Sequence, residues 1–224
     1  MLPMLRRRLR LVLGAFCALA ATALPVLAAT PQISVRDGHV LALDAQGRVF
    51  GWGGDSQGEL GVARPVFATA PTKVPGLPSL RGVAAGKAHA LALDQSGKVW
   101  AWGDNGEGQL GLRSETNSAR VGIVRGLEGM VQVAAGDAFS AALAADGQVY
   151  VWGRNPLDKE VTAIPVALPG VRAVSGIVAG ARHLLLMRRD GTLLAVGDND
   201  WGQLGISSTT RQDTVVRVPR LSGI

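Results

Sequence analysis

The sequence is poor in the residues that usually build cross-linked or redox-active sites. It has one cysteine, Cys17, and that residue lies in an N-terminal apolar segment, so the rest of the chain can form neither a disulfide nor a thiol-based site. Aromatic residues make up only 4% of the chain and charged residues 18%, whereas 47% of the residues are hydrophobic. A folded domain in this chain must therefore be held together by a packed, mainly aliphatic core.

Excess positive charge is also largely missing outside the first ten residues. The formal net charge is +6, and Arg6, Arg7, Arg8 and Arg10 supply four of these positive charges, which leaves +2 for the remainder. Nucleic-acid-binding proteins usually show clustered Lys and Arg residues over one face. The sequence gives little support to that class, and we expect no nucleic-acid partner.

The N-terminus has the pattern of an export signal. The basic segment "MLPMLRRRLR" is followed by the apolar run "LVLGAFCALAATALPVLAA", in which Pro25 interrupts the run. Val26-Leu27-Ala28 fits the small-residue pattern that precedes signal cleavage. We expect residues 1–28 to be a signal peptide cleaved after Ala28, with a periplasmic or secreted protein and no membrane contact as the result. The alternative is an uncleaved membrane anchor.

After this segment the sequence repeats itself four times. The copies begin at Ile33, Val83, Val133 and Ile177, and they divide residues 29–224 into units near 33–82, 83–132, 133–176 and 177–224. Trp52, Trp102 and Trp152 recur at intervals of 50 residues, and the fourth copy has Val196 in their place. The third copy lacks the "GQLG" loop that follows the corresponding position in the other three. Sequence repeats of roughly 45–50 residues are typical of proteins built from successive copies of one small structural unit.

Each copy has the pattern of paired β-strands. Apolar segments such as "HALAL" and "KVWAW" alternate small and large side chains and are separated by short turns that end in glycine. The four turns are Gln46-Gly47, Ser96-Gly97, Asp146-Gly147 and Asp190-Gly191. A further strand precedes each unit, in "PTKVPGL", "ARVGIVRGL", "VTAIPVALPG" and finally "DTVVRVPRL". Several strands in a unit of this length predict an all-β protein built from β-propeller blades.

The glycine-rich segment "AWGDNGEGQLG" could be mistaken for a phosphate-binding loop. It recurs as "GWGGDSQGELG" and "AVGDNDWGQLG", and no helix follows it to contribute an N-terminal dipole. We therefore interpret it as a structural loop whose glycines allow tight turns. Leu60, Leu110 and Leu204, which end these loops, are expected to fill the gap between neighbouring blades.

In combination, these motifs resemble the regulator of chromosome condensation repeat. The resemblance rests on V-A-A-G, a His or Phe three residues later, the hairpin D-x-x-G-x-V-W-x-W-G and G-x-L-G, and it extends from Ile33 to Ile224. Proteins of that family are usually seven-bladed propellers, whereas this sequence has four units. The resemblance implies one of two arrangements, namely a small closed ring sealed by the last strand or a partial propeller completed by self-association through the terminal blades.

Three histidines share one repeat position and raise the question of a metal site. His39, His89 and His183 align, and Phe139 replaces them in the third copy. Equivalent repeat positions lie on different blades, and no close pair of ligands accompanies the histidines. We expect packed histidines that are hydrogen-bonded to the backbone, with no metal and no cofactor.

Residues that depart from the repeat are the better candidates for a specific function. Trp201 replaces Glu107 in the glycine-rich loop, and an aromatic side chain there is a possible interface anchor, with packing on a neighbouring blade as the alternative. Phe67, in "ARPVFATAP", is a second candidate partner-binding residue. Asn105 and Asn199 align in the same loop and could contact a ligand, although such side chains more often cap their own turns.

The sequence contains no pattern of catalytic residues. A Ser-His-Asp arrangement and the zinc motif H-E-x-x-H are both missing, and the only acidic residues set apart from the repeat are Asp158 and Glu160, which we interpret as solvated loop charges. We therefore expect a non-enzymatic module that binds a protein partner of unknown identity through loops on one propeller face.

Several alternatives stay open. Some exported members of similar architecture look like inhibitors of secreted enzymes, including β-lactamases. A lectin-like or polysaccharide-acting propeller is a further alternative, and a pair of acidic residues facing the central channel would favour an enzyme. A degenerate copy without a present role is another. Nucleotide exchange on a nuclear small GTPase, the best-known activity of the family, does not fit an exported protein.

Overall fold

A computed structural model describes residues 28–62, 66–112, 116–157, 160–221 and 223. All regular structure in these residues is β-strand, in agreement with the all-β prediction. Within them no helix is present that could span a membrane. The expected signal peptide lies almost wholly outside the described residues, so it stays a prediction.

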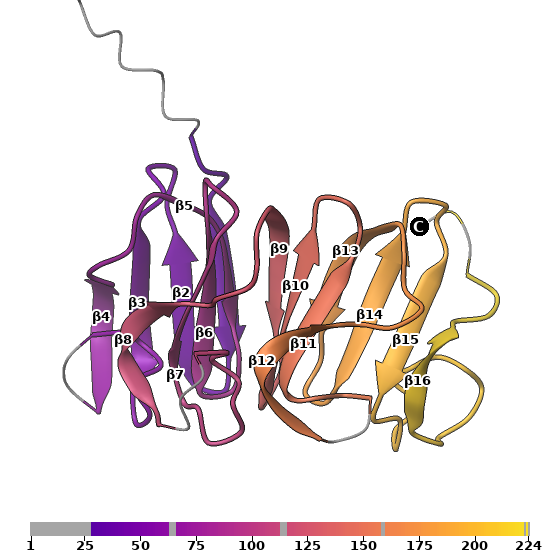
Figure 1. The fold of residues 1–224 in the computed structure, drawn as a ribbon. Helices are drawn as coiled ribbons and strands as arrows, with labels where there is room; N and C mark the ends of the chain where they lie inside the picture. The colour runs from indigo at the N-terminus through magenta and orange to yellow at the C-terminus, as the bar shows by residue number, and fades with distance from the viewer. Residues whose placement is uncertain (1–27, 63–65, 113–115, 158–159, 222, 224) are drawn as a thin grey trace, which may run out of the picture.

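The strands form four antiparallel sheets of four strands each, which follow one another along the chain from indigo to yellow in Figure 1. We call these sheets blades 1 to 4. Blade 1 consists of β1 (Gln32–Arg36), β2 (His39–Leu43), β3 (Val49–Gly54) and β4 (Phe67–Lys73). Blade 2 consists of β5 (Leu80–Ala85), β6 (His89–Asp94), β7 (Val99–Gly103) and β8 (Ser118–Ile123). Blade 3 consists of β9 (Met130–Ala135), β10 (Phe139–Ala144), β11 (Val149–Arg154) and β12 (Val161–Ala167). Blade 4 consists of β13 (Val174–Ala179), β14 (His183–Arg188), β15 (Leu193–Gly197) and β16 (Gln212–Arg217).

The predicted glycine turns join the second and third strands of every blade. Gly47, Gly97, Gly147 and Gly191 all have positive φ angles, between 74° and 89°. At Gly47 an added Cβ would come within 2.3 Å of the Ser79 hydroxyl, so the turn also packs tightly against the strand of the next blade. The further strand predicted before each unit is the last strand of the preceding blade, and its position matches the predicted segment in blades 2, 3 and 4. In blade 1 it begins earlier, at Phe67, and ends at Lys73, because the following Pro75-Gly76 forms a turn.

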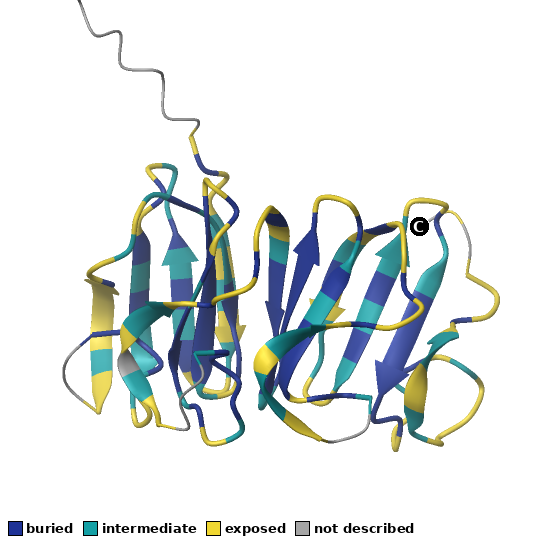
Figure 2. Ribbon diagram, in the orientation of Figure 1, coloured by how far each residue is buried: buried dark blue, intermediate teal, exposed yellow. Residues whose placement is uncertain are grey.

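The core lies between the blades. The central strands β6 and β10 are buried along their whole length, whereas the outer strands β4 and β16 are largely exposed (Figure 2). Side chains on facing sides of adjacent blades form separate apolar clusters at each boundary. Leu110 belongs to the cluster between blades 2 and 3, which confirms that this loop leucine fills the gap between blades.

The four blades form an open arc. Each blade packs on the next through its inner strands, and in the described part of the chain no strand of blade 4 is hydrogen-bonded to a strand of blade 1. The last strand, β16, pairs with β15 of its own blade and not with blade 1. The small closed ring sealed by the last strand is therefore not formed, because β16 is the outer strand of the blade 4 sheet. The partial propeller is the arrangement observed.

Candidate interaction surface

One side of the arc carries the long connections. Successive antiparallel strands reverse direction, so the turns between the first and second strands and the loops between the third and fourth strands lie on the same side, which is the lower side in Figure 1. We call this side the loop face. The opposite side carries the short glycine turns and is called the turn face.

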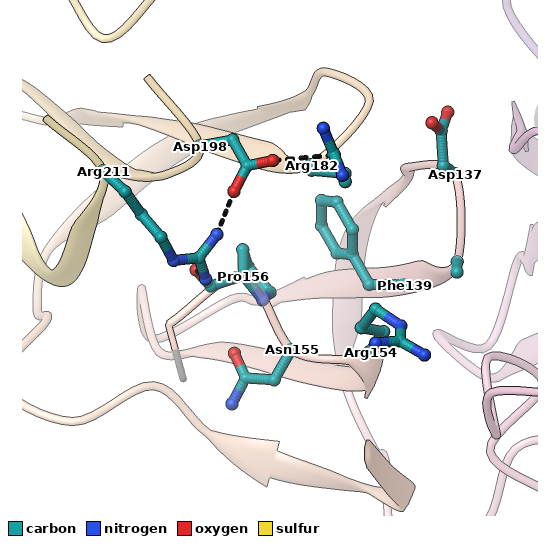
Figure 3. A pocket seen from close by; sticks show the side chains of 9 residues that line it. Asp137, Phe139, Arg154, Asn155, Pro156, Arg182, Asp198 and Arg211 are labelled. Carbon is teal, nitrogen blue, oxygen red and sulfur yellow. Dashed lines mark hydrogen bonds and ion pairs between the residues drawn. The ribbon is translucent and has the colours of Figure 1, made fainter. Parts of the chain in front are cut away.

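A pocket of about 640 Å³ opens on the loop face at the boundary between blades 3 and 4 (Figure 3). The buried Phe139 and Pro156 lie in its wall, and charged side chains from both blades surround them. The charged residues that line it are Asp137, Arg154, Arg182, Asp198 and Arg211.

The pocket lies where two departures from the repeat coincide. At the other two boundaries, a tryptophan donates a hydrogen bond to a carbonyl in the glycine-rich loop of the preceding blade, from Trp102 Nε1 to Glu59 O and from Trp152 Nε1 to Gln109 O, each at 2.8 Å. Blade 3 has no such loop, and blade 4 has Val196 at the tryptophan position. Because blade 3 offers no loop carbonyl as an acceptor, blade 4 does not need a tryptophan donor at this position.

Arg211 makes the contact that replaces this tryptophan. Its Nη2 donates to the carbonyl of Pro156 at 2.6 Å and to that of Leu157 at 3.3 Å, in the short loop of blade 3. The same guanidinium pairs with Asp198 through Nη1, and its Nε lies 2.5 Å from Asp213. Because only 17% of this side chain is exposed, it has a structural role, and it joins blade 4 to the short loop of blade 3.

Two other arginines of the pocket are more accessible. Arg182 pairs with Asp198 through its Nε at 2.7 Å, yet 65% of its side chain is exposed. Arg154 pairs with Glu107 of blade 2 and is 46% exposed. Because both guanidinium groups are exposed on one side, each can offer its remaining N–H donors to an incoming carboxylate.

A second hollow on the loop face has the opposite charge. It spans blades 1 to 3, has a volume of about 1200 Å³, and is lined mainly by acidic residues with one lysine. The charged residues that line it are Asp37, Glu59, Lys87, Asp104, Glu107 and Asp137. The loop face is thus acidic over blades 1 and 2 and rich in arginine at the boundary of blades 3 and 4.

Arg36 lies where the inner strands meet the loop face. It occupies the position of Gly86, Gly136 and Gly180 in the other copies, and its Nη2 lies 2.7 Å from Asp137 of blade 3. The groove between the inner strands is otherwise lined by small or apolar residues from all four blades, and Arg36 is the only charged residue in its described lining. This lining therefore contains no pair of acidic residues of the kind that would favour a polysaccharide-acting enzyme.

The three aligned histidines differ in burial, since His39 and His89 are buried and His183 in blade 4 is only half-buried. His89 is fully buried, and its Nε2 lies 3.0 Å from Ser140 Oγ of blade 3; since that hydroxyl donates to Gln109 O, the imidazole is the donor. The pKa of His89 is lowered to about 3, mainly by burial, with smaller contributions from the nearby His39 and Arg36 charges. Burial likewise lowers the pKa values of His39 and His183. Among the described residues, no group of three His, Cys, Asp or Glu side chains could hold a metal ion.

The candidate partner-binding residues fall into two groups. Asn105 and Asn199 are buried, and their Oδ1 atoms each accept from a backbone N–H five residues later, in Leu110 and Leu204, at 2.9 Å. Neither side chain can touch a partner directly, and both correspond to the alternative role of capping their own loops. Sequence reasoning missed Arg154 and Arg182, because a single arginine in a loop gives no signal until the neighbouring blade is placed beside it.

The two aromatic candidates are exposed. Trp201 is 92% exposed and Phe67 is 60% exposed. Neither lines the two hollows of the loop face. Of the two acidic residues set apart from the repeat, Asp158 lies outside the described residues, and Glu160 accepts a hydrogen bond from Asn155 N through its backbone carbonyl.

Comparison with known proteins agrees with this architecture. Residues 46–93 and 96–143 match the model of the regulator of chromosome condensation (RCC1) repeat, and residues 81–109 match a second model of the same repeat. A search of curated proteins found no significant match.

Solved structures share the fold over most of the chain. Human WBSCR16 has a TM-score of 0.78 at 26% sequence identity, over 85% of this chain and 53% of its own. Yeast Prp20, in a complex with Kap60, has a TM-score of 0.73 at 23% identity, over 84% of this chain and 48% of its own. Prp20p from Saccharomyces cerevisiae in a second structure gives 0.72 at 21% identity, over 84% and 50%. The chain thus spans about half the length of these structures.

Proposed function

Because the chain belongs to the family of regulator of chromosome condensation repeat β-propellers, we propose that it is a protein-interaction module whose loop face binds a protein partner. A propeller fold alone does not define a function, so the proposal rests on the site. The observation that carries it is a pair of hollows on one face, one rich in arginine and one acidic, in which Arg154 and Arg182 are exposed and available to a partner.

The charges suggest how a partner would dock. Arg154 and Arg182 line the pocket and are exposed, so the pocket suits an acidic segment. The acidic hollow over blades 1 and 2 suits a basic segment of the same partner. Complementary charges of this kind orient two proteins and accelerate their association.

The protein partners of Prp20 include Kap60, Gsp1p and histones. These partners belong to Prp20, and at the identities found the likeness supports the same fold and only the general class of function. For this chain we propose a partner in the periplasm or outside the cell, because the basic and apolar N-terminal segment has the pattern of an export signal. Inhibition of a secreted enzyme would be one form of such binding.

Charge reversal on the two faces tests the proposal. The full chain serves as bait for exported proteins of its own source, and any captured protein is then purified and titrated by calorimetry. We expect Arg154→Glu with Arg182→Glu to weaken binding of that protein at least tenfold. The matched control, Lys98→Glu with Arg125→Glu, reverses two exposed charges on the turn face and should leave affinity unchanged. Equal affinity for both double variants, or loss in the control alone, would contradict a loop-face site.

A further inference from the structure

The boundaries inside the chain define what a complete blade-to-blade interface contains. At the boundary of blades 1 and 2, Gly61 has a φ of 67° and leaves room for the Trp102 indole, which an added Cβ would meet at 2.9 Å. Gly111 and Trp152 repeat this arrangement between blades 2 and 3, with a φ of 65° and the same 2.9 Å. Each glycine-rich loop therefore forms a socket for the tryptophan of the following blade.

Blade 4 has the same socket without a tryptophan. Gly205 has a φ of 65°, and the nearest atom to an added Cβ is Val218 Cγ1 at 3.3 Å. The loop is otherwise built as in the earlier copies, since Leu204 is buried and Asn199 accepts from its N–H. The carbonyl of Gln203 aligns with the acceptors Glu59 O and Gln109 O. This end of the chain thus presents a preformed acceptor for an indole.

Blade 1 has a tryptophan without a socket. Trp52 aligns with Trp102 and Trp152, and no hydrogen bond from its Nε1 is found in the described part of the chain. Around it lies an apolar surface that corresponds to the buried side of blade 2, with Ile33 at 74% and Val35 at 64% exposure. The open end of blade 1 is therefore the other half of the same interface.

The two aromatic residues that break the repeat also match each other. At the boundary of blades 1 and 2, Asn117 Nδ2 donates to Gln57 Oε1. Trp201 occupies in blade 4 the repeat position of Gln57, and Phe67 occupies in blade 1 the position of Asn117, because both pair with the end of the third strand. A polar pair inside the chain is thus replaced by an aromatic pair at the two open ends.

Neither open end has the polar outer surface that terminal repeats need in order to stay soluble. Val178 of blade 4 is 64% exposed, and Leu185, Met187 and Leu193 on the same side are only half-buried. Blade 1 presents half-buried Phe50 and Trp52 in addition to its exposed Ile33 and Val35.

We propose that two copies of this chain close into one eight-bladed ring, in which blade 4 of each copy packs on blade 1 of the other. At each of the two junctions, the Trp52 indole enters the socket at Gly205 and donates to Gln203 O, and Trp201 stacks against Phe67. A second copy is the occupant because the two ends are complementary halves of an interface that the chain already makes internally. Two copies also supply roughly the chain length of the solved relatives, of which one copy spans about half.

Light scattering on the full chain measures the mass of the particle in solution and so tests whether the chain forms a dimer. We expect twice the mass of one chain, and we expect Trp52→Ala or Trp201→Ala to raise the dissociation constant of the dimer at least tenfold. The matched control is Val161→Ala, which truncates an exposed apolar residue on the outer strand of an inner blade and should leave the dimer intact. Circular dichroism reports whether each variant keeps its sheet content, so a loss of dimer is separated from a loss of fold.

Crosslinking tests the arrangement. In a Cys17→Ser background the chain has no other cysteine, so Trp201→Cys and Phe67→Cys can be placed alone or together and treated with a short bis-maleimide. We expect a covalent dimer from the double variant and from a mixture of the two single variants, and none from either single variant alone. The internal pair Gln57→Cys and Asn117→Cys should crosslink within one chain without a change in mass.

Three results would overturn the ring. A monomer at every concentration, with no crosslink between copies, would mean that something other than a second copy covers the ends. A crosslink in a single-cysteine variant as fast as in the double variant would mean that the contact is not between blades 4 and 1. A ladder of ever larger oligomers would mean that the ends pair without closing.

Discussion

Acidification should destabilise this protein through His89. The imidazole is fully buried between blades 2 and 3, where its Nε2 bonds to Ser140 Oγ and burial lowers its pKa to about 3. In the unfolded chain the same group has a pKa near 6.5. Between these two pH values the unfolded chain binds a proton that the folded protein excludes. Stability is therefore fully present above pH 6.5 and is lost as the pH falls toward 3.

The magnitude follows from the two pKa values. Lowering the pH from 7.5 to 5.0 should reduce the free energy of unfolding by about 2 kcal/mol through His89 alone. The buried His39 and half-buried His183 also have lowered pKa values, so they change stability in the same direction.

The chain itself suggests the comparison variant. Phe139 occupies the position of His89 in blade 3, and each ring packs on a glycine three residues earlier, Gly136 and Gly86 respectively. His89→Phe therefore fits a site of known shape and removes the titrating group. Urea denaturation at pH 7.5 and pH 5.0 gives the pH-dependent loss for each protein, and we expect the loss to be about 2 kcal/mol smaller in the variant.

This test compares, for each protein, the loss in the free energy of unfolding between pH 7.5 and pH 5.0, and not the stability itself. The variant can be less stable at both, because Ser140 loses its imidazole donor, and carboxylates titrate equally in both proteins. If wild type and His89→Phe lose the same stability on acidification, the reasoning about the buried imidazole is refuted.

Three further predictions concern the contacts between blades. Trp102→Ala should lower the free energy of unfolding by about 3–5 kcal/mol in urea denaturation, because it empties a fully buried site and leaves a loop carbonyl without its donor. Arg211→Ala should speed hydrogen exchange in residues 160–167 at least tenfold, because it releases the short loop of blade 3 and leaves the mostly buried Asp198 with one fewer partner. Arg211→Lys should restore the slow exchange only in part, because Lys lacks the planar guanidinium. Asp137→Asn, which weakens the partly exposed pair with Arg36, should change the thermal midpoint by only a few degrees, and a large drop would mean that this pair fixes the arc.

Much of the fold could be read from the sequence because its cause is local. The fourfold repeat, the alternating apolar strands and the positive-φ glycines at Gly47 and its equivalents are properties of short segments, and the structure confirms them. The same holds for the turn before Gly47, where Asp44 accepts from the Gln46 and Arg48 N–H groups as an Asp before a hairpin turn should.

The site was less predictable because it depends on contacts between blades. The pocket beside Phe139 exists only where the short loop of blade 3 meets Arg211 from a segment 55 residues later. Asn105 and Asn199 were candidate binding residues from their position, and only the folded loop buries them.

The sequence by itself determined the strands, their turns and the grouping of four blades, because these follow from residue periodicity within each unit. Only the tertiary structure decided that the arc stays open, since β16 pairs with β15 in the sheet of blade 4 and with no strand of blade 1. The internal blade boundaries, which only the structure shows, also connect Trp52 and Phe67 of blade 1 with Gly205 and Trp201 of blade 4. The residues at the equivalent positions contact one another at these internal boundaries.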